Sequence, residues 1–332
     1  MEQDIVTQFN EAIRRGDIDY VRHCIEHDCT AIDLNCGFVN AVNFGHIELV
    51  KLFLADPRVD PMAHGNEALI YALRYNRPDI MKLLLEVSKF EPVIYNEAFE
   101  TMIELGFVEL ARLFIEDAQI APVLDYNDSI GIAICEDRFH IVQMMLVGSY
   151  FDPAAGNNYA IRYAAKLGHL KIVKLLMKDP RVDPTASENY AFRHACKNGH
   201  VKTAKFLLTD PRINPNDAKI YAIRFAMISN RVKVVKLLLS KPEISQCVNG
   251  IGAIEIPLTR GMPKMLRLSL NHFKYMADIH VYINHVHLFA LHNDDRMRAV
   301  KIMWEKRLIK YWWHVKEVLQ IHAHVDVFTH II

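Results

Sequence analysis

The sequence predicts an all-α fold, built as a solenoid of about ten helix-turn-helix repeats of roughly 31 residues each. Three observations predict this fold. One segment recurs in register along nearly the whole chain, and each copy holds two short stretches with apolar residues at helical spacing. Gly or Pro separates these stretches, as expected where helices end.

The recurrence is clearest in the second half of the chain. Copies that begin at Asn158, Asn189 and Ile220 read NYAIRYAAKLGHLKIVKLLM, NYAFRHACKNGHVKTAKFLL and IYAIRFAMISNRVKVVKLLL, and they start 31 residues apart both times. Further copies, with one step of 30 residues among steps of 31, begin at Asn35, Asn66, Asn96, Asn127 and Ile251.

The regularity of the copies predicts three parts. Residues 1–34 form a degenerate N-terminal capping repeat, residues 35–281 form the repeat array, and residues 282–332 hold a loose final repeat and a C-terminal capping helix. The last part includes the amphipathic segment around Trp312 and Trp313, which is expected to cover the outer face of the terminal repeat. Docking of a partner on this segment is the alternative.

Each copy follows the same physical logic. The first stretch, such as YAIRYAAKLG, has Ala where a neighbouring helix must approach closely. Gly-His or a polar substitute ends it, because Gly tolerates the positive φ of a helix C-cap. The second stretch carries an apolar stripe, Ile172, Val173, Leu175 and Leu176, and Asp179-Pro180 then stops the helix. Two such short helices cannot bury their apolar faces alone, so the copies must stack.

The segments GHLKIVKLLM (168–177) and GHIELVKLFL (45–54), with the preceding A-x-x-x-G-H frame, resemble the ankyrin repeat. The T-P-L-H opening of that family is replaced here by Y-A-I-R or Y-A-F-R, the period is 31 rather than 33, and DPRVDP stands where the family usually has G-A-D-V-N. This variant is similar to ankyrin proteins of large DNA viruses of amoebae and of some protists. The resemblance implies an ankyrin-type solenoid that acts as a non-enzymatic, protein-binding scaffold, with a role in host–virus interaction and a location in the cytoplasm, including that of a host cell.

Partners of ankyrin proteins commonly bind the connector tips and the exposed end of the first helix, and the resemblance places that end just before Gly-His. These positions vary in chemistry along the chain while the packing positions do not. The apolar ones would act as anchors, since large apolar side chains dominate binding hot spots; the alternative is that they pack on the next repeat. The expected partner-binding residues are Asn43, Phe44, Arg74, Tyr75, Glu104, Leu105, Glu136, Lys166, Leu167, Lys197, Asn198, Ile228, Ser229 and Arg260.

The formal net charge of zero conceals an asymmetry. Residues 1–157 hold 26 acids and 11 bases, whereas residues 158–332 hold 13 acids and 28 bases. In a solenoid this becomes a field along the rod that steers partners and favours head-to-tail contacts. We therefore expect a monomer with weak, salt-sensitive self-association. The alternative is solvated faces that merely differ between repeats.

The basic stretch 158–245 suggests a second function, the binding of an anionic polymer such as nucleic acid or a phospholipid surface. Nucleic acid is not favoured, because along the sequence the aromatics are not interleaved with the bases as a stacking platform. Arg162, Arg193 and Arg224 recur at one repeat position. We expect them to form a structural ladder, and a ridge for phosphate or carboxylate is the alternative.

Other chemistry is not supported by the sequence. It has no Gly-rich phosphate loop, no G-x-S-x-G and no H-E-x-x-H, so neither catalytic residues nor cofactors are expected. The pairs His285/His287 and His322/His324 lack completing ligands, and no metal site is predicted. No apolar run approaches the length of a membrane span, and residues 1–10 lack the apolar region of a secretory signal.

The cysteines show no paired C-x-x-C spacing, which predicts reduced and mostly buried thiols in an intracellular protein. They are Cys24, Cys29, Cys36, Cys135, Cys196 and Cys247.

Overall fold

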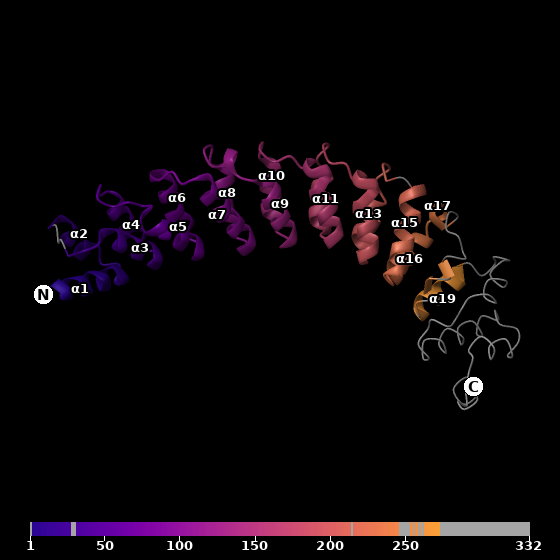
Figure 1. Ribbon diagram of the computed structural model, residues 1–332, viewed down its shortest axis with the longest axis horizontal. Helices are drawn as coiled ribbons and strands as arrows, with labels where there is room; N and C mark the ends of the chain where they lie inside the picture. The colour runs from indigo at the N-terminus through magenta and orange to yellow at the C-terminus, as the bar shows by residue number, and fades with distance from the viewer. Residues whose placement is uncertain are drawn as a thin grey trace, which may run out of the picture. The chain divides into compact units, whose positions relative to one another are not determined.

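The computed structural model describes residues 2–27, 31–213, 215–245, 253–254, 256–257, 260 and 262–272. Across these residues all regular structure is helical and no strand occurs (Figure 1). None of the described helices has the length and apolar character needed to cross a membrane. The predicted final repeat, the segment around Trp312 and the two histidine pairs lie outside the described residues.

Contacts divide the chain into two units, Met1–Asp152 and Pro153–Ile332. Unit 1 is a row of helix pairs: α1 (Glu2–Arg15) with α2 (Ile18–Glu26), α3 (Leu34–Phe44) with α4 (Ile47–Leu54), α5 (Ala63–Arg74) with α6 (Pro78–Val87), α7 (Pro92–Leu105) with α8 (Val108–Glu116), and α9 (Tyr126–Cys135) with α10 (Phe139–Val147). A short 3-10 turn, η1 (Ala121–Val123), precedes α9.

Unit 2 continues the pattern. Its pairs are α11 (Ala155–Leu167) with α12 (Leu170–Leu176), α13 (Ala186–Asn198) with α14 (Val201–Leu207), and α15 (Pro215–Ile228) with α16 (Val232–Leu239), followed by α17 (Pro242–Ser245) and α19 (Pro263–His272). Within each unit, first helices pack on first helices and second helices on second helices, so each unit has two layers. The predicted helix-turn-helix repeat is confirmed.

The first helices end as the sequence predicts. Gly168 has φ 88°, and Gly45 has φ 82°, both in the left-handed region. Where glycine is replaced, Asn76 and Asp137 adopt φ 50° and 51°. A short polar side chain tolerates this conformation better than a branched one, because it can hydrogen-bond locally. The predicted polar substitutes for glycine are therefore confirmed.

The core lies between the two helix layers. Of the predicted stripe on α12, Ile172, Val173 and Leu176 are fully buried, and Leu175 is half-buried. In unit 1 the rings of Phe99 and Phe114 stack with centroids 6.4 Å apart. The thiols follow the prediction only in part: Cys24 and Cys196 are buried, but Cys36 and Cys135 are exposed, because the latter two occupy surface positions of first helices.

Three first helices begin with a left-handed turn that the sequence did not predict. In α5, α11 and α13 the residues 64–66, 156–158 and 187–189 all have positive φ. The guanidinium of Arg162 donates to the carbonyl oxygens of Asn157 (2.9 Å) and Gly156 (3.0 Å), and Arg193 bonds that of Ser187 (3.0 Å). The structural role of these two arginines is confirmed, although each bonds to the turn of its own repeat and not to its equivalent in the next.

The connectors are held by their own charged residues. In the DPR connectors, Arg58, Arg181 and Arg212 each form a two-pronged contact with the Asp two positions earlier, with nitrogen–oxygen distances of 2.7–3.0 Å. These hydrogen bonds hold the pKa of Asp56 and its two equivalents below the usual range. Arg58 also reaches the carbonyl oxygen of Ile25 in the preceding repeat, at 3.0 Å.

The Asn that opens several copies joins neighbouring repeats. The side-chain oxygen of Asn35 accepts from the backbone N–H of Asp60 at 2.8 Å, and Asn158 does the same with Asp183 at 2.7 Å. These Asn positions, which recur from copy to copy, are therefore structural.

Candidate partner-binding surface

The predicted helix-end positions reach the surface more fully in unit 1. There Phe44, Tyr75 and Leu105 are 40%, 47% and 53% exposed. Arg74, Glu104 and Glu136 are also exposed, and Asn43 is half-buried. These apolar side chains are thus accessible as anchors, and their role in binding stays a prediction.

In unit 2 the same positions are more covered. Leu167 and Ile228 are half-buried, which fits the alternative of packing on the next repeat. Lys197 and Arg260 are exposed, whereas Lys166, Asn198 and Ser229 are half-buried. Charge and hydrogen-bonding groups, not apolar anchors, are the main features that unit 2 presents at its helix ends.

The ends of the first helices are capped by the next repeat. The residue that follows the Gly position forms a hydrogen bond with a carbonyl oxygen at the end of the first helix in the preceding repeat. His46 bonds that of Arg14 at 3.1 Å, and His200 bonds that of Lys166 at 3.0 Å. Arginine does the same in other copies, including Arg138, which donates to Ile103 at 2.9 Å. Donors at a helix C-terminus satisfy open carbonyls and complement its partial negative charge. The predicted capping role of Gly-His is confirmed, and the histidine caps the first helix of the preceding repeat.

Two predicted partner-binding residues take part in this capping. The amide of Asn198 donates to the carbonyl oxygen of Lys166 at 2.7 Å, and Arg260 donates to that of Ile228 at 3.4 Å. Part of their donor capacity is therefore used within the fold. The sequence could not show this, because each bond joins residues more than 30 positions apart.

The first helices of unit 2 carry a mixed face of aromatic and basic side chains. We call it the basic–aromatic face; it consists of Tyr159, Arg162, Tyr163, Lys166, Tyr190, Arg193, His194, Lys197, Tyr221, Arg224 and Phe225. The aromatics are interleaved with the bases here, which corrects the expectation drawn from the linear sequence. They meet because helical spacing and the 31-residue repeat bring them to one side.

Basic side chains of this face lie over its aromatic rings. Arg162 lies over the ring of Tyr190, 5.2 Å from its centroid, and Lys166 lies over Tyr163 at 5.4 Å. Lys197 lies 5.8 Å from the ring centroid of Phe225. Cation–π contacts of this kind fix the charged groups in place, so the face presents ordered positive charge and not a row of open stacking surfaces.

The histidine of this face does not add to its charge. Burial, together with the positive charges of Lys197, Arg193 and Lys166, lowers the pKa of His194 to about 4. His194 stacks on Tyr190 with ring centroids 3.8 Å apart. The imidazole is therefore neutral at pH 7, and the positive charge comes from arginine and lysine alone.

At the corresponding repeat positions unit 1 is acidic. We call this the acidic face; it consists of Glu67, Glu97, Glu100, Glu104 and Asp128. The pKa of Glu100 is raised, first by burial and then by repulsion from Asp128 and Glu104. The first-helix faces of the two units thus share in the charge asymmetry of the sequence, with opposite sign.

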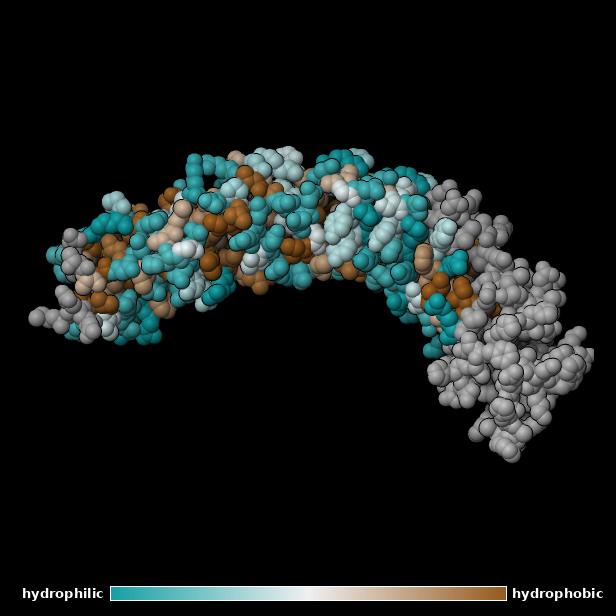
Figure 2. All heavy atoms as spheres, viewed as in Figure 1, coloured by the Kyte–Doolittle hydropathy of each residue, from teal (hydrophilic) through white to brown (hydrophobic). Residues whose placement is uncertain are grey.

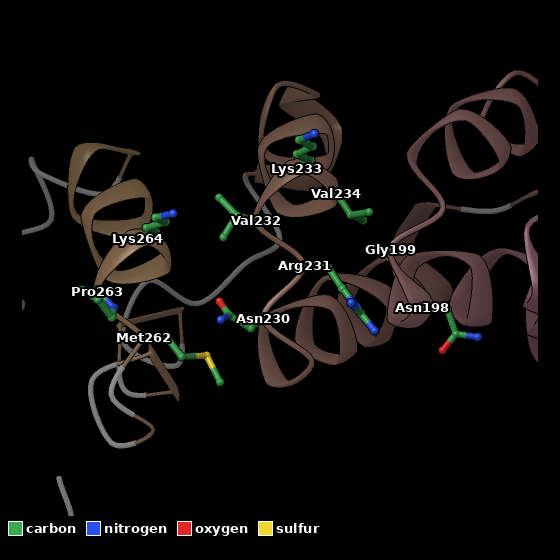
Figure 3. Close-up of a pocket in the computed structure, with 10 residues that line it drawn as sticks. All are labelled: Asn198, Gly199, Asn230, Arg231, Val232, Lys233, Val234, Met262, Pro263 and Lys264. Atoms are coloured by element: carbon green, nitrogen blue, oxygen red, sulfur yellow. The ribbon is translucent and has the colours of Figure 1, made fainter. Parts of the chain in front are cut away.

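Each unit also has a groove between neighbouring repeats. In unit 1 a groove of about 350 Å³ lies between α5 and α7 and includes the predicted residues Arg74 and Leu105. In unit 2 a groove of about 690 Å³ runs from the end of α13 past the start of α16 to the start of α19, where Figure 3 shows Arg231, Lys233 and Lys264. On the side seen in Figure 2, apolar patches are exposed over unit 1, whereas the surface over α11 and α13 is mostly hydrophilic.

Comparison with known families agrees with this architecture. A family model for ankyrin repeats in three copies matches residues 9–95, 130–219 and 161–249, which together exceed half of the chain. The chain belongs to the ankyrin repeat family. Ankyrin repeats generally mediate protein–protein interactions, and ankyrin domains are typically non-catalytic scaffolds. A search of curated proteins finds no match to this ankyrin chain. Among the described residues, no three histidine, cysteine or acidic side chains are grouped so that they could hold a metal ion.

Proposed function

We propose that this ankyrin chain is a non-enzymatic scaffold that binds a partner protein on its first-helix faces and helix ends, and that it acts in host–virus interaction in the cytoplasm. One observation carries the proposal. Positions that pack or cap are alike from copy to copy, while the helix-end positions beside them change: Asn43 and Arg74 in unit 1 correspond to Lys166 and Lys197 in unit 2, and Phe44 and Tyr75 correspond to Leu167 and Asn198. A constant frame with variable exposed positions is suited to recognising one particular protein.

The first test reverses charge on unit 2. The partner is identified by affinity purification and mass spectrometry, and capture is then measured with Lys166→Glu, Leu167→Asp and Lys197→Glu combined. We expect capture to fall by about 100-fold. The new carboxylates would repel acidic groups of a partner that is complementary to the lysines, and central interface residues carry most of the binding energy. Circular dichroism should show unchanged helix content.

A matched control makes the same chemical changes on second helices. Lys171 and Lys202 are exposed on α12 and α14, and Leu175 is half-buried on α12. The variant Lys171→Glu, Leu175→Asp and Lys202→Glu should retain capture. Equal capture by both triple variants would show that the partner does not use the first-helix face of unit 2.

The basic–aromatic face supports a second candidate, the binding of an anionic polymer by residues 158–245. Phosphate contacts would make the logarithm of the affinity fall linearly with that of the salt concentration, with a slope of about −0.7 per neutralised phosphate on single strands. The measurement is fluorescence anisotropy with single-stranded DNA and RNA, and sedimentation with anionic vesicles. Absence of binding at low salt would eliminate this candidate.

We also propose that two copies of the chain associate through the acidic face of one and the basic–aromatic face of the other. Exposed ion pairs contribute only about 0–1 kcal/mol each, so opposite faces on two copies should associate weakly. Light scattering through the same salt series should give a monomer mass at physiological salt and a rising mass as salt falls. A mass that does not change with salt would contradict self-association through these faces.

A further inference from the structure

The groove between α5 and α7 is apolar at its floor and walls. Leu69, Leu73 and Ala98 are buried beneath it. Ile70 and Leu105 stand at its two sides and are 44% and 53% exposed. A concave site with a buried apolar floor and exposed apolar walls can remove a further apolar side chain from water.

An irregular repeat accounts for the groove. The copies that begin at Asn66 and Asn96 are 30 residues apart, one fewer than the usual step. Helix α7 starts directly at Pro92, without the left-handed turn that opens α5. Helix α5 packs more sparsely on α7 than on α3. Side chains that would otherwise meet the next first helix are therefore left facing solvent.

The acidic face adjoins the groove at Glu97. Glu97 lines the groove, and Glu67, Glu100 and Glu104 of the acidic face lie on the same two helices. None of these four carboxylates forms an ion pair within the described part of the chain. Among the described residues, Arg74 is the one basic side chain that lines the groove, and its guanidinium lies 5.5 Å from the ring centroid of Tyr71. Repulsion among the carboxylates would be relieved by a cation brought by a ligand.

We propose that the α5–α7 groove binds one large apolar side chain of a basic polypeptide segment of the partner, while the adjoining acidic face holds the neighbouring lysine or arginine side chains. The apolar contact supplies the anchor, and the carboxylates select for positive charge. This inference rests on the proposed scaffold function and names the chemistry that one of its surfaces recognises.

Selection from a phage library of random peptides, with the full chain as bait, tests the proposal. The enriched peptides should carry a net positive charge and one large apolar residue. Replacing that residue by Ala in a synthetic copy should weaken binding about tenfold, as should Ile70→Asp or Leu105→Asp in the protein. Val87 is 54% exposed on α6 and does not line the groove, so Val87→Asp should leave binding unchanged.

Several outcomes would overturn the proposal: no enriched peptide, enrichment of acidic or purely polar peptides, or equal binding to the Ile70→Asp variant. Failure here can be separated from failure of the scaffold function. If the partner is still captured by Ile70→Asp but lost by the triple variant at Lys166, Leu167 and Lys197, the groove assignment is wrong and the scaffold remains. If the basic peptides bind but no partner is captured, the groove assignment is supported and the scaffold function is contradicted.

Discussion

Replacement of Gly168 by Ala is expected to lower the free energy of unfolding of unit 2 by about 2–4 kcal/mol, through left-handed strain and overpacking together. Gly168 has φ +88°, and a Cβ built on it would lie 2.3 Å from Nδ1 of His200. The imidazole cannot move aside freely, because its Nε2 lies 3.0 Å from the carbonyl oxygen of Lys166. Urea unfolding of the full chain, followed by circular dichroism, measures the effect.

Other glycines provide graded controls. Gly65 has φ +68° with no atom within 4 Å of an added Cβ, so Gly65→Ala should cost only the left-handed strain, about 1–2 kcal/mol. At Gly45 the Cβ would meet the guanidinium of Arg77, which can swing away, so an intermediate cost is expected. Adding His200→Ala to Gly168→Ala should recover part of the loss. Equal costs at Gly168 and Gly65 would refute the contact with His200 as the cause.

Replacement of Phe99 by Ala is expected to destabilise unit 1 by about 3–5 kcal/mol. Phe99 is fully buried and stacks on Phe114, and its ring centroid lies 6.2 Å from that of Tyr126 on the next first helix. Burial raises the pKa of Tyr126 to about 12, in keeping with a phenol held in this core. Because neighbouring repeats stabilise each other, loss of this junction should also separate the urea transition of unit 1 into two steps.

The control for this prediction is Phe44→Ala. Phe44 is partly exposed at the end of α3, so its removal should change the free energy of unfolding by about 0.5 kcal/mol or less. A single unfolding transition for Phe99→Ala with a loss as small as that of the control would show that the aromatic cluster does not join the repeats energetically.

Features that depend on local sequence could be predicted. The left-handed helix ends at Gly168 and at Asp137, and the buried stripe through Ile172 and Val173, follow from residue type and helical spacing. The partners across repeats could not be predicted in the same way. The bond from His46 to Arg14 spans 32 residues, and periodicity gives the register of such positions without showing which side chain reaches a carbonyl. The left-handed turn at 187–189 was missed because non-glycine residues rarely adopt it.

The candidate surface was predicted unevenly. Exposed helix ends such as Tyr75 and Leu105 follow from their place before the Gly position. The mixed face of unit 2 was missed since Tyr159 and Lys197 are distant along the chain and become neighbours only when copies stack. The α5–α7 groove had a visible signal, the single 30-residue step. Its consequence depends on how two helices pack, which the step alone does not specify.

Capping by the following repeat makes each copy dependent on its successor. His200 completes the helix that ends at Leu167, and Arg231 completes the one that ends at Asn198 through the carbonyl oxygen of Lys197, at 3.1 Å. If a copy were duplicated in register, its His or Arg would cap the first helix of the copy before it. Its own first helix would be capped by the copy that follows. The array can therefore lengthen by whole copies without any change in the residues already present, and the surface it offers to partners can grow in the same increments.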